Sequence, residues 1–113
     1  PNAAPLFERI MASDPNAWQL GMAISFLAKH GQYPRAYALI EARAFEALEA
    51  APDEGARQLI RSIQTTQIGD SYEEGRERWR TDPQVAARWP ALAQRLWDYQ
   101  VERFGEQRAY PLR

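Results

Sequence analysis

Among the residues of this chain that could do chemistry, His30 is the only histidine. It directly precedes Gly31, a residue type common at helix ends, so we expect His30 in the last turn of a helix. A protonated imidazole there interacts favourably with the carboxyl end of the helix. A catalytic base would need an orienting group and a nucleophile, and a metal ligand would need partner ligands; no motif near His30 supplies them. We therefore predict a structural role for His30.

Carboxylates are concentrated around the end of one expected helix, at Glu41, Glu46, Glu49, Asp53 and Glu54. Two carboxylates can hydrolyse a glycosidic bond when they oppose each other across a cleft. Here the spacing is that of a solvated helix face followed by a helix start. The chain also has no cysteine, phosphate-binding loop, nucleophile elbow or metal-ligand motif. We predict that the protein is not an enzyme and binds no metal or cofactor.

The sharpest local feature is the arginine-rich segment that surrounds Trp79. On a helix, Arg76 and Arg80 are one turn apart and flank the same edge as Trp79. Guanidinium groups beside an indole ring can hold an anionic or aromatic partner. The alternative is that Trp79 lies in the core while the arginines pair with neighbouring glutamates. The sequence leaves both interpretations open.

Four tryptophans in 113 residues are a second source of binding chemistry. Trp18 lies on an expected helix with two apolar stripes, which predicts a core position. Any tryptophan exposed on the other helices would mark a protein interface, because clustered aromatic rings contribute strongly to contact energy. The predicted partner-binding surface comprises Tyr33, Tyr37, Arg76, Trp79, Arg80, Trp89 and Trp97.

The elements expected to position these residues are all helices. Each strong signal is a helix start or stop, such as Asp14-Pro15 and Asp82-Pro83 at starts and Gly31 and Gly105 at ends. We predict about six helices, at residues 4–12, 15–29, 34–50, 53–68, 71–80 and 83–104. The last should break at Trp89-Pro90, because the residue before proline avoids helical geometry. The polar tail at 106–113 is expected to be loose.

Length and composition indicate one globular domain, residues 1–113. The net charge of −1 disfavours nucleic-acid binding. Residues 76–113 nevertheless hold eight arginines against five carboxylates, and Lys29 is the only lysine. We interpret this arginine bias as a bacterial-like genome composition; the alternative is a surface that pairs with carboxylate or phosphate groups. No apolar run could span a membrane and no signal peptide is visible, so we expect a cytoplasmic protein.

The segment 17–52 resembles a helical hairpin of the tetratricopeptide type. The residues that carry the resemblance are Gly31, Tyr33 and Ala36, which have the small–aromatic–small spacing found where the two helices of that family meet. The family's usual proline after the second helix comes late, at Pro52, and no second copy of the pattern follows. The resemblance implies antiparallel helices and peptide or protein binding on a concave face.

The sequence thus predicts an all-α, compact bundle of about six helices built on antiparallel hairpins. The predicted function is that of a non-catalytic protein-interaction module: an adaptor, a chaperone-like protein or an inhibitor or immunity protein. Two alternatives stay open. One is a small-molecule-binding or enzymatic bundle with a tryptophan-lined pocket. The other is a structural subunit of a larger assembly, with homo-oligomers included.

Overall fold

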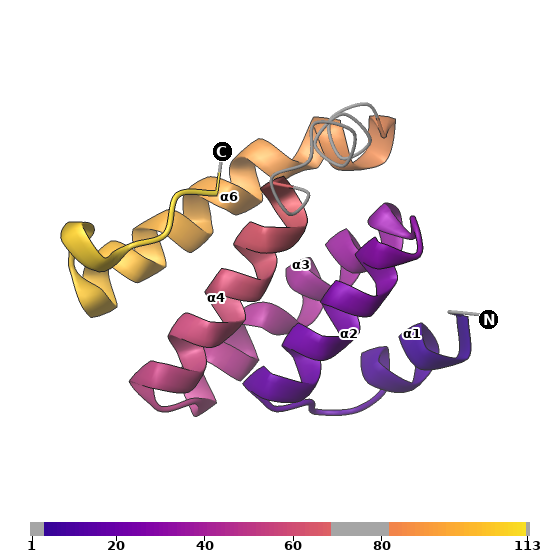
Figure 1. Ribbon diagram of the computed structural model, residues 1–113, viewed down its shortest axis with the longest axis horizontal. Helices are drawn as coiled ribbons and strands as arrows, with labels where there is room; N and C mark the ends of the chain where they lie inside the picture. Colours follow the sequence, from indigo (N-terminus) through magenta and orange to yellow (C-terminus); the bar gives the residue numbers. More distant parts are fainter. Residues whose placement is uncertain (1–3, 69–81, 113) are drawn as a thin grey trace.

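A computed structural model describes residues 4–68 and 82–112, apart from the side chains of Ala4, Leu6, Gln67 and Ile68. Within these ranges every regular element is helical, as predicted (Figure 1). The elements are α1 (Ala4–Met11), α2 (Ala17–Lys29), α3 (Tyr33–Ala50), α4 (Asp53–Ile68), α6 (Pro83–Phe104) and the 3₁₀-helix η1 (Glu106–Arg108). The helix predicted at 71–80 lies outside the described residues. None of the described helices has the length and apolar character needed to cross a membrane.

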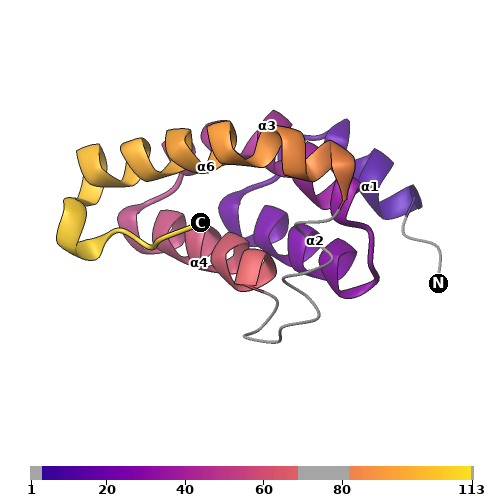
Figure 2. The ribbon, with the colours of Figure 1, turned by 90° about the horizontal axis from the view of Figure 1, so that it is seen from above.

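The helices form two layers. α2 and α4 contact each other and lie side by side in the nearer layer of Figure 1. In Figure 2, which turns the molecule by 90°, α3 and α6 form the upper layer and α2 and α4 the lower one. α3 contacts α2, α4 and α6. α1 contacts α2 and α3 at one end of the molecule. One face of the protein is therefore built from α2 and α4.

The core lies between the two layers. Helical periodicity predicts one apolar face on the third helix and one on the fourth, and both are confirmed because every residue of these faces is buried. The residues are Ala36, Tyr37, Ile40, Ala44, Ala47 and Leu48 on α3, and Ala56, Leu59, Ile60 and Ile63 on α4. The largest fully buried apolar side chains are Leu20, Ile24, Leu27, Leu39, Ile40, Leu48, Leu59, Ile60, Ile63 and Leu96. Each large aliphatic side chain buried in this way contributes about 1.5–3 kcal/mol to stability.

Asparagine, and not the predicted Asp14-Pro15 pair, starts α2. The Asn16 side chain accepts a hydrogen bond from the backbone N–H of Gln19 at 2.8 Å, and the Gln19 side chain accepts one from the backbone N–H of Asn16 at 3.0 Å. This reciprocal capping box satisfies two N–H groups that the helix leaves unpaired. At the start of α6 the predicted cap is confirmed: the Asp82 carboxylate accepts bonds from the backbone N–H groups of Gln84 and Val85.

Two glycines end helices as predicted. Gly31 follows α2 with φ of 74°, and Gly105 follows α6 with φ of 90°. L-residues with side chains rarely adopt these angles, so glycine terminates both helices at low conformational cost.

α2 buries only one of its two apolar stripes. Leu20, Ile24 and Leu27 lie in the core, whereas Trp18 is 67% exposed and Met22 is 56% exposed. The prediction that Trp18 lies in the core is therefore wrong. The physical reason is that α1, α3 and α4, which all contact α2, leave this second stripe uncovered.

α6 runs through Pro90 without the predicted break. An interior proline removes a backbone hydrogen bond and destabilises a helix by about 3 kcal/mol. Pro90 is exposed, whereas Trp89 and Leu92 beside it are only 6% and 2% exposed. Burial of one continuous apolar face offsets the disruption that proline causes.

Residues 106–112 of the tail are ordered, contrary to prediction. Leu112 is 3% exposed, and its carbonyl accepts a hydrogen bond from the Trp89 indole N–H at 3.2 Å. The buried Gln100 side chain bonds to both the backbone N–H and the carbonyl of Tyr110. The polar composition predicts a loose tail, but the side chains of Trp89 and Gln100 on α6 hold its backbone in place.

Candidate functional site

Two residues of the predicted partner-binding surface come together, but in the core. Tyr37 on α3 is 4% exposed, and its ring lies edge-on to the buried Trp89 ring with centroids 6.4 Å apart. The Tyr37 hydroxyl donates to Glu41 Oε2 at 3.2 Å, and Arg88 pairs with the same carboxylate. Burial and the neighbouring Glu41 carboxylate raise the pKa of Tyr37 above its ordinary value. This cluster joins α3 to α6.

The remaining residues of that surface do not form one patch in the described structure. Tyr33 is half-buried and packs against the core, and Trp97 is half-buried on α6. Arg76, Trp79 and Arg80 lie outside the described residues, so the arginine–tryptophan motif stays a prediction.

The exposed pair Trp18 and Met22 marks a different surface. The two residues are four apart on α2, so their side chains neighbour each other on one helix face. They are the exposed large hydrophobic side chains of the described residues. The sequence signal at this place is that α2 carries no charged residue before Lys29, but that signal is equally typical of a helix buried on two sides.

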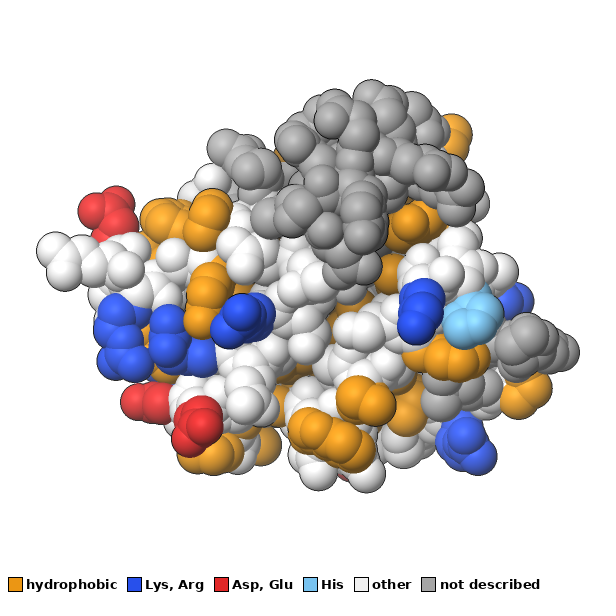
Figure 3. Space-filling model, viewed as in Figure 1, with side chains coloured by type: hydrophobic (Ala, Val, Ile, Leu, Met, Phe, Trp, Pro, Cys, Tyr) orange, Lys and Arg blue, Asp and Glu red, His pale blue; other side chains and the backbone are white. Residues whose placement is uncertain are grey.

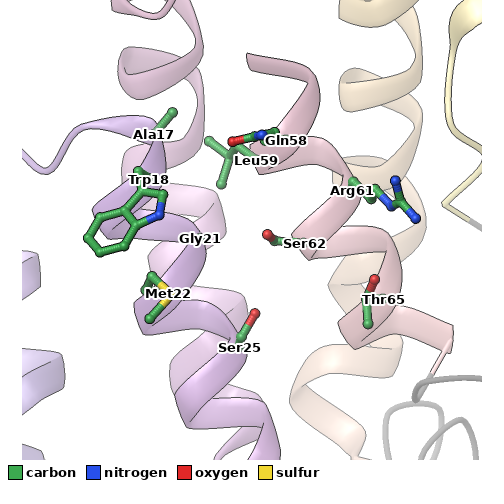
Figure 4. Close-up of a pocket in the computed structure, with 10 residues that line it drawn as sticks. All are labelled: Ala17, Trp18, Gly21, Met22, Ser25, Gln58, Leu59, Arg61, Ser62 and Thr65. Atoms are coloured by element: carbon green, nitrogen blue, oxygen red, sulfur yellow. The ribbon is translucent and has the colours of Figure 1, made fainter. Parts of the chain in front are cut away.

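A depression of about 410 Å³ lies between α2 and α4, next to this pair. Gly21 forms its floor, where the helices approach so closely that a Cβ atom on Gly21 would lie 3.1 Å from the Ser62 hydroxyl oxygen. Figure 4 shows Ser62 directed toward Gly21, with Trp18 and Met22 on the α2 side. The lining residues are Ala17, Trp18, Gly21, Met22, Ser25, Gln58, Leu59, Arg61, Ser62 and Thr65.

A second, smaller depression of about 270 Å³ also has Trp18 in its lining. It is lined by Asn16, Ala17, Trp18, Ala47, Ala50, Ala51, Pro52 and Gly55. Trp18 thus lines two hollows. The second is otherwise lined mostly by small side chains, which leave room for the side chains of a binding partner beside Trp18.

Basic side chains border the same face along α4. Arg57, Arg61 and Arg108 line a third depression, together with Asp53 and Glu54. The Arg57 guanidinium lies over the Tyr110 ring, 5.0 Å from its centroid. Figure 3 shows basic and hydrophobic side chains close to one another on the face that carries α2 and α4.

The residues considered for catalysis have structural contacts. His30 directly follows α2, where its Nδ1 lies 2.9 Å from the Phe26 carbonyl oxygen and its ring packs on the Phe26 ring. Asp53 accepts from Arg103 Nε at 2.9 Å, and Arg103 also donates to backbone carbonyls that end α3. In the described part of the chain, no group of three or more histidine, cysteine or acidic residues could hold a metal ion.

No protein-family model, curated protein or solved structure matches this chain. The resemblance to tetratricopeptide hairpins therefore stays a prediction.

Proposed function

We propose that this protein is a non-catalytic protein-interaction module that binds a partner through the face formed by α2 and α4. The observation that carries the proposal is the exposure of Trp18 and Met22, one helical turn apart and beside the depression floored by Gly21. Tryptophan is the residue type most enriched among those that dominate binding energy at protein interfaces. Methionine adapts its shape to different partners.

The shape of the face favours a macromolecular partner over a small ligand. Sites for small molecules enclose most of the ligand surface. The two depressions that share Trp18 in their linings are open to solvent and do not enclose a ligand in this way. An open surface with apolar anchors suits a segment of another protein. This supports the predicted adaptor, chaperone-like or inhibitor role over a tryptophan-lined ligand pocket.

The test compares the partners of two surface variants. In Trp18→Ser/Met22→Ser, the apolar pair is removed from the proposed surface. In Gln94→Ser/Asp98→Ser, an exposed pair one turn apart on α6 of the other layer is removed, which makes it a matched control. Affinity capture from the native cell should lose its specific partners with the first variant and keep them with the second. Recovery of the same partners by both variants and the wild type would contradict the proposal.

The oligomeric state separates this proposal from the structural-subunit alternative. Light scattering after size-exclusion chromatography gives the mass of the isolated chain. A monomer that captures its partner through Trp18 supports an interaction module. A stable oligomer that the Trp18→Ser/Met22→Ser variant dissociates would instead assign the face to contacts between copies of the chain.

A further inference from the structure

The face formed by α2 and α4 differs in charge from the rest of the protein. The whole chain has 15 acidic and 14 basic residues. None of the 13 residues of α2 is acidic, and α4 has no acidic residue after Glu54. The basic residues of these stretches are Lys29, Arg57 and Arg61, and Arg108 joins them from the tail. The surface is therefore locally basic on a protein of nearly neutral net charge.

The two carboxylates close to these arginines neutralise them only in part. Asp53 is already engaged by Arg103 at 2.9 Å, which leaves Glu54 facing three arginines. Arg57 is held by the Tyr110 ring and by a hydrogen bond from its Nη2 to the Arg108 carbonyl at 3.3 Å. Among the described residues, the guanidinium groups of Arg61 and Arg108 make no hydrogen bond or ion pair. Both are exposed and free to bind an anionic group.

The apolar and basic residues occupy opposite edges of the face. Figure 4 shows Trp18 and Met22 on the α2 side, whereas Arg61 on α4 extends away from α2 toward the C-terminal segment. Packed helices have axes about 8–10 Å apart, and a helix with its side chains is about 10–12 Å wide. A third helix lying over the Gly21 groove would therefore reach both edges at once.

We infer that the occupant of this face is an acidic amphipathic helix of a partner protein, an inference that rests on the proposed function. Its apolar stripe faces Trp18 and Met22, and its carboxylates lie on the flank that faces Arg61 and Arg108. From Ala17 to Ser25 the groove is about 12 Å long, which corresponds to about two turns of the docked helix. Anchors spaced three and four residues apart match this length, as in other helix-in-groove complexes.

A nucleic acid fits the same face less well. Single-stranded nucleic acids bind along rows of exposed aromatic side chains on a strongly basic surface. Here Trp18 has Met22 as its exposed hydrophobic neighbour, and a glutamate lies among the arginines. An acidic helix satisfies both the apolar and the basic edge.

The experiment selects binders from a displayed library of helix-forming peptides with randomised surface positions. The full chain is the bait, and Trp18→Ser/Met22→Ser is used for counter-selection. We expect enriched peptides with apolar residues at i, i+3 or i+4 and i+7, and with glutamate or aspartate on one adjacent flank. The absence of enriched peptides, or enrichment of neutral or basic ones, would overturn the inference.

Charge reversal then tests the basic edge directly. Arg61→Glu/Arg108→Glu should weaken binding of the enriched peptides by about tenfold or more, because each change replaces an attraction with a repulsion. Arg9→Glu/Arg95→Glu, which reverses two exposed arginines of α1 and α6, is the matched control and should change the affinity by less than about twofold. Wild-type binding should also weaken as ionic strength rises. Equal affinities of the two charge-reversal variants would overturn the inference.

The outcomes separate this inference from the proposed function. Peptides that need Trp18 but show no acidic preference overturn the inference and leave the proposed function standing. Partner capture that does not depend on Trp18 overturns both. Oligothymidylate and phosphatidylserine vesicles serve as further probes. Binding of either probe that Arg61→Glu abolishes, without enrichment of acidic peptides, would assign the face to phosphate groups instead.

Discussion

Trp18 and Trp89 are the same residue type in opposite environments. Trp89 is 6% exposed, packs against Tyr37 and donates its indole N–H to Leu112. Trp18 is 67% exposed and lines two surface hollows. The Trp89 region holds α3, α6 and the tail together, whereas the Trp18 region leaves apolar surface open. The same residue type therefore stabilises the bundle at one position and presents uncovered apolar surface at the other.

The largest expected effect is on the Trp89 side. Trp89→Ala should lower the free energy of unfolding by about 3–5 kcal/mol, because it leaves a cavity and an unpaired Leu112 carbonyl. Urea denaturation followed by far-ultraviolet circular dichroism measures the change. Trp89→Phe keeps most of the apolar volume but not the N–H donor, so it should have a smaller effect. A loss below about 1 kcal/mol for Trp89→Ala would break the contrast with Trp18.

A substitution of Gln100 tests whether the tail contributes to the stability of the region around Trp89. The side chain is fully buried and bonds to both backbone groups of Tyr110. Gln100→Leu keeps an apolar shape but leaves both groups without that partner, which should destabilise the fold by about 2 kcal/mol. Hydrogen exchange at the Tyr110 amide should also become faster. An unchanged exchange rate would show that the tail is held by other contacts.

Tyr37 makes the free energy of unfolding depend on pH. Its pKa is raised above 10.0 in the folded protein, because burial and Glu41 disfavour the phenolate. Below pH 10.0 both the folded and the unfolded states are protonated; above it the unfolded chain loses its proton first, so stability falls as pH rises. Tyr37→Phe should lose about 1 kcal/mol at neutral pH, through the missing bond to Glu41, and show a shallower alkaline decline. Urea midpoints across alkaline pH check this, and equal slopes would contradict it.

The smallest expected effect on stability is at Trp18. Trp18→Ser should change the free energy of unfolding by no more than about 0.5 kcal/mol, because the side chain is exposed and makes no described hydrogen bond. The same variant should lower the fraction of the tryptophan emission that iodide quenches. A large loss of stability would show that Trp18 is part of the core in solution and would weaken the proposed function.

Much of the helical framework could be predicted from the sequence. α4 has the predicted bounds of 53–68, and the predicted apolar faces of α3 and α4 are buried, because helical periodicity directly reflects which side meets the core. The glycine ends and the Asp82 cap depend on local geometry, which local sequence encodes. These features need no knowledge of distant residues.

The misplaced features depend on contacts that local patterns do not contain. Whether α6 breaks at Pro90 depends on the burial of the flanking Trp89 and Leu92, which is a property of the whole bundle. Whether Trp18 is covered depends on how far the neighbouring helices extend, so a second apolar stripe alone predicts a core position equally well. The candidate surface was missed for this reason.

The tail is held in place by hydrogen bonds to its backbone. Side chains of the two layers donate to four of its backbone carbonyls: Arg57 to Arg108, Gln64 to Pro111, Trp89 to Leu112 and Gln100 to Tyr110. Every residue type has a backbone carbonyl, so these hydrogen bonds do not depend on which side chains the tail carries. Apart from Arg108, which the proposed binding face uses, the exposed residues of the tail can therefore diverge among related chains, while the four donors on α4 and α6 are the positions that natural selection should hold constant.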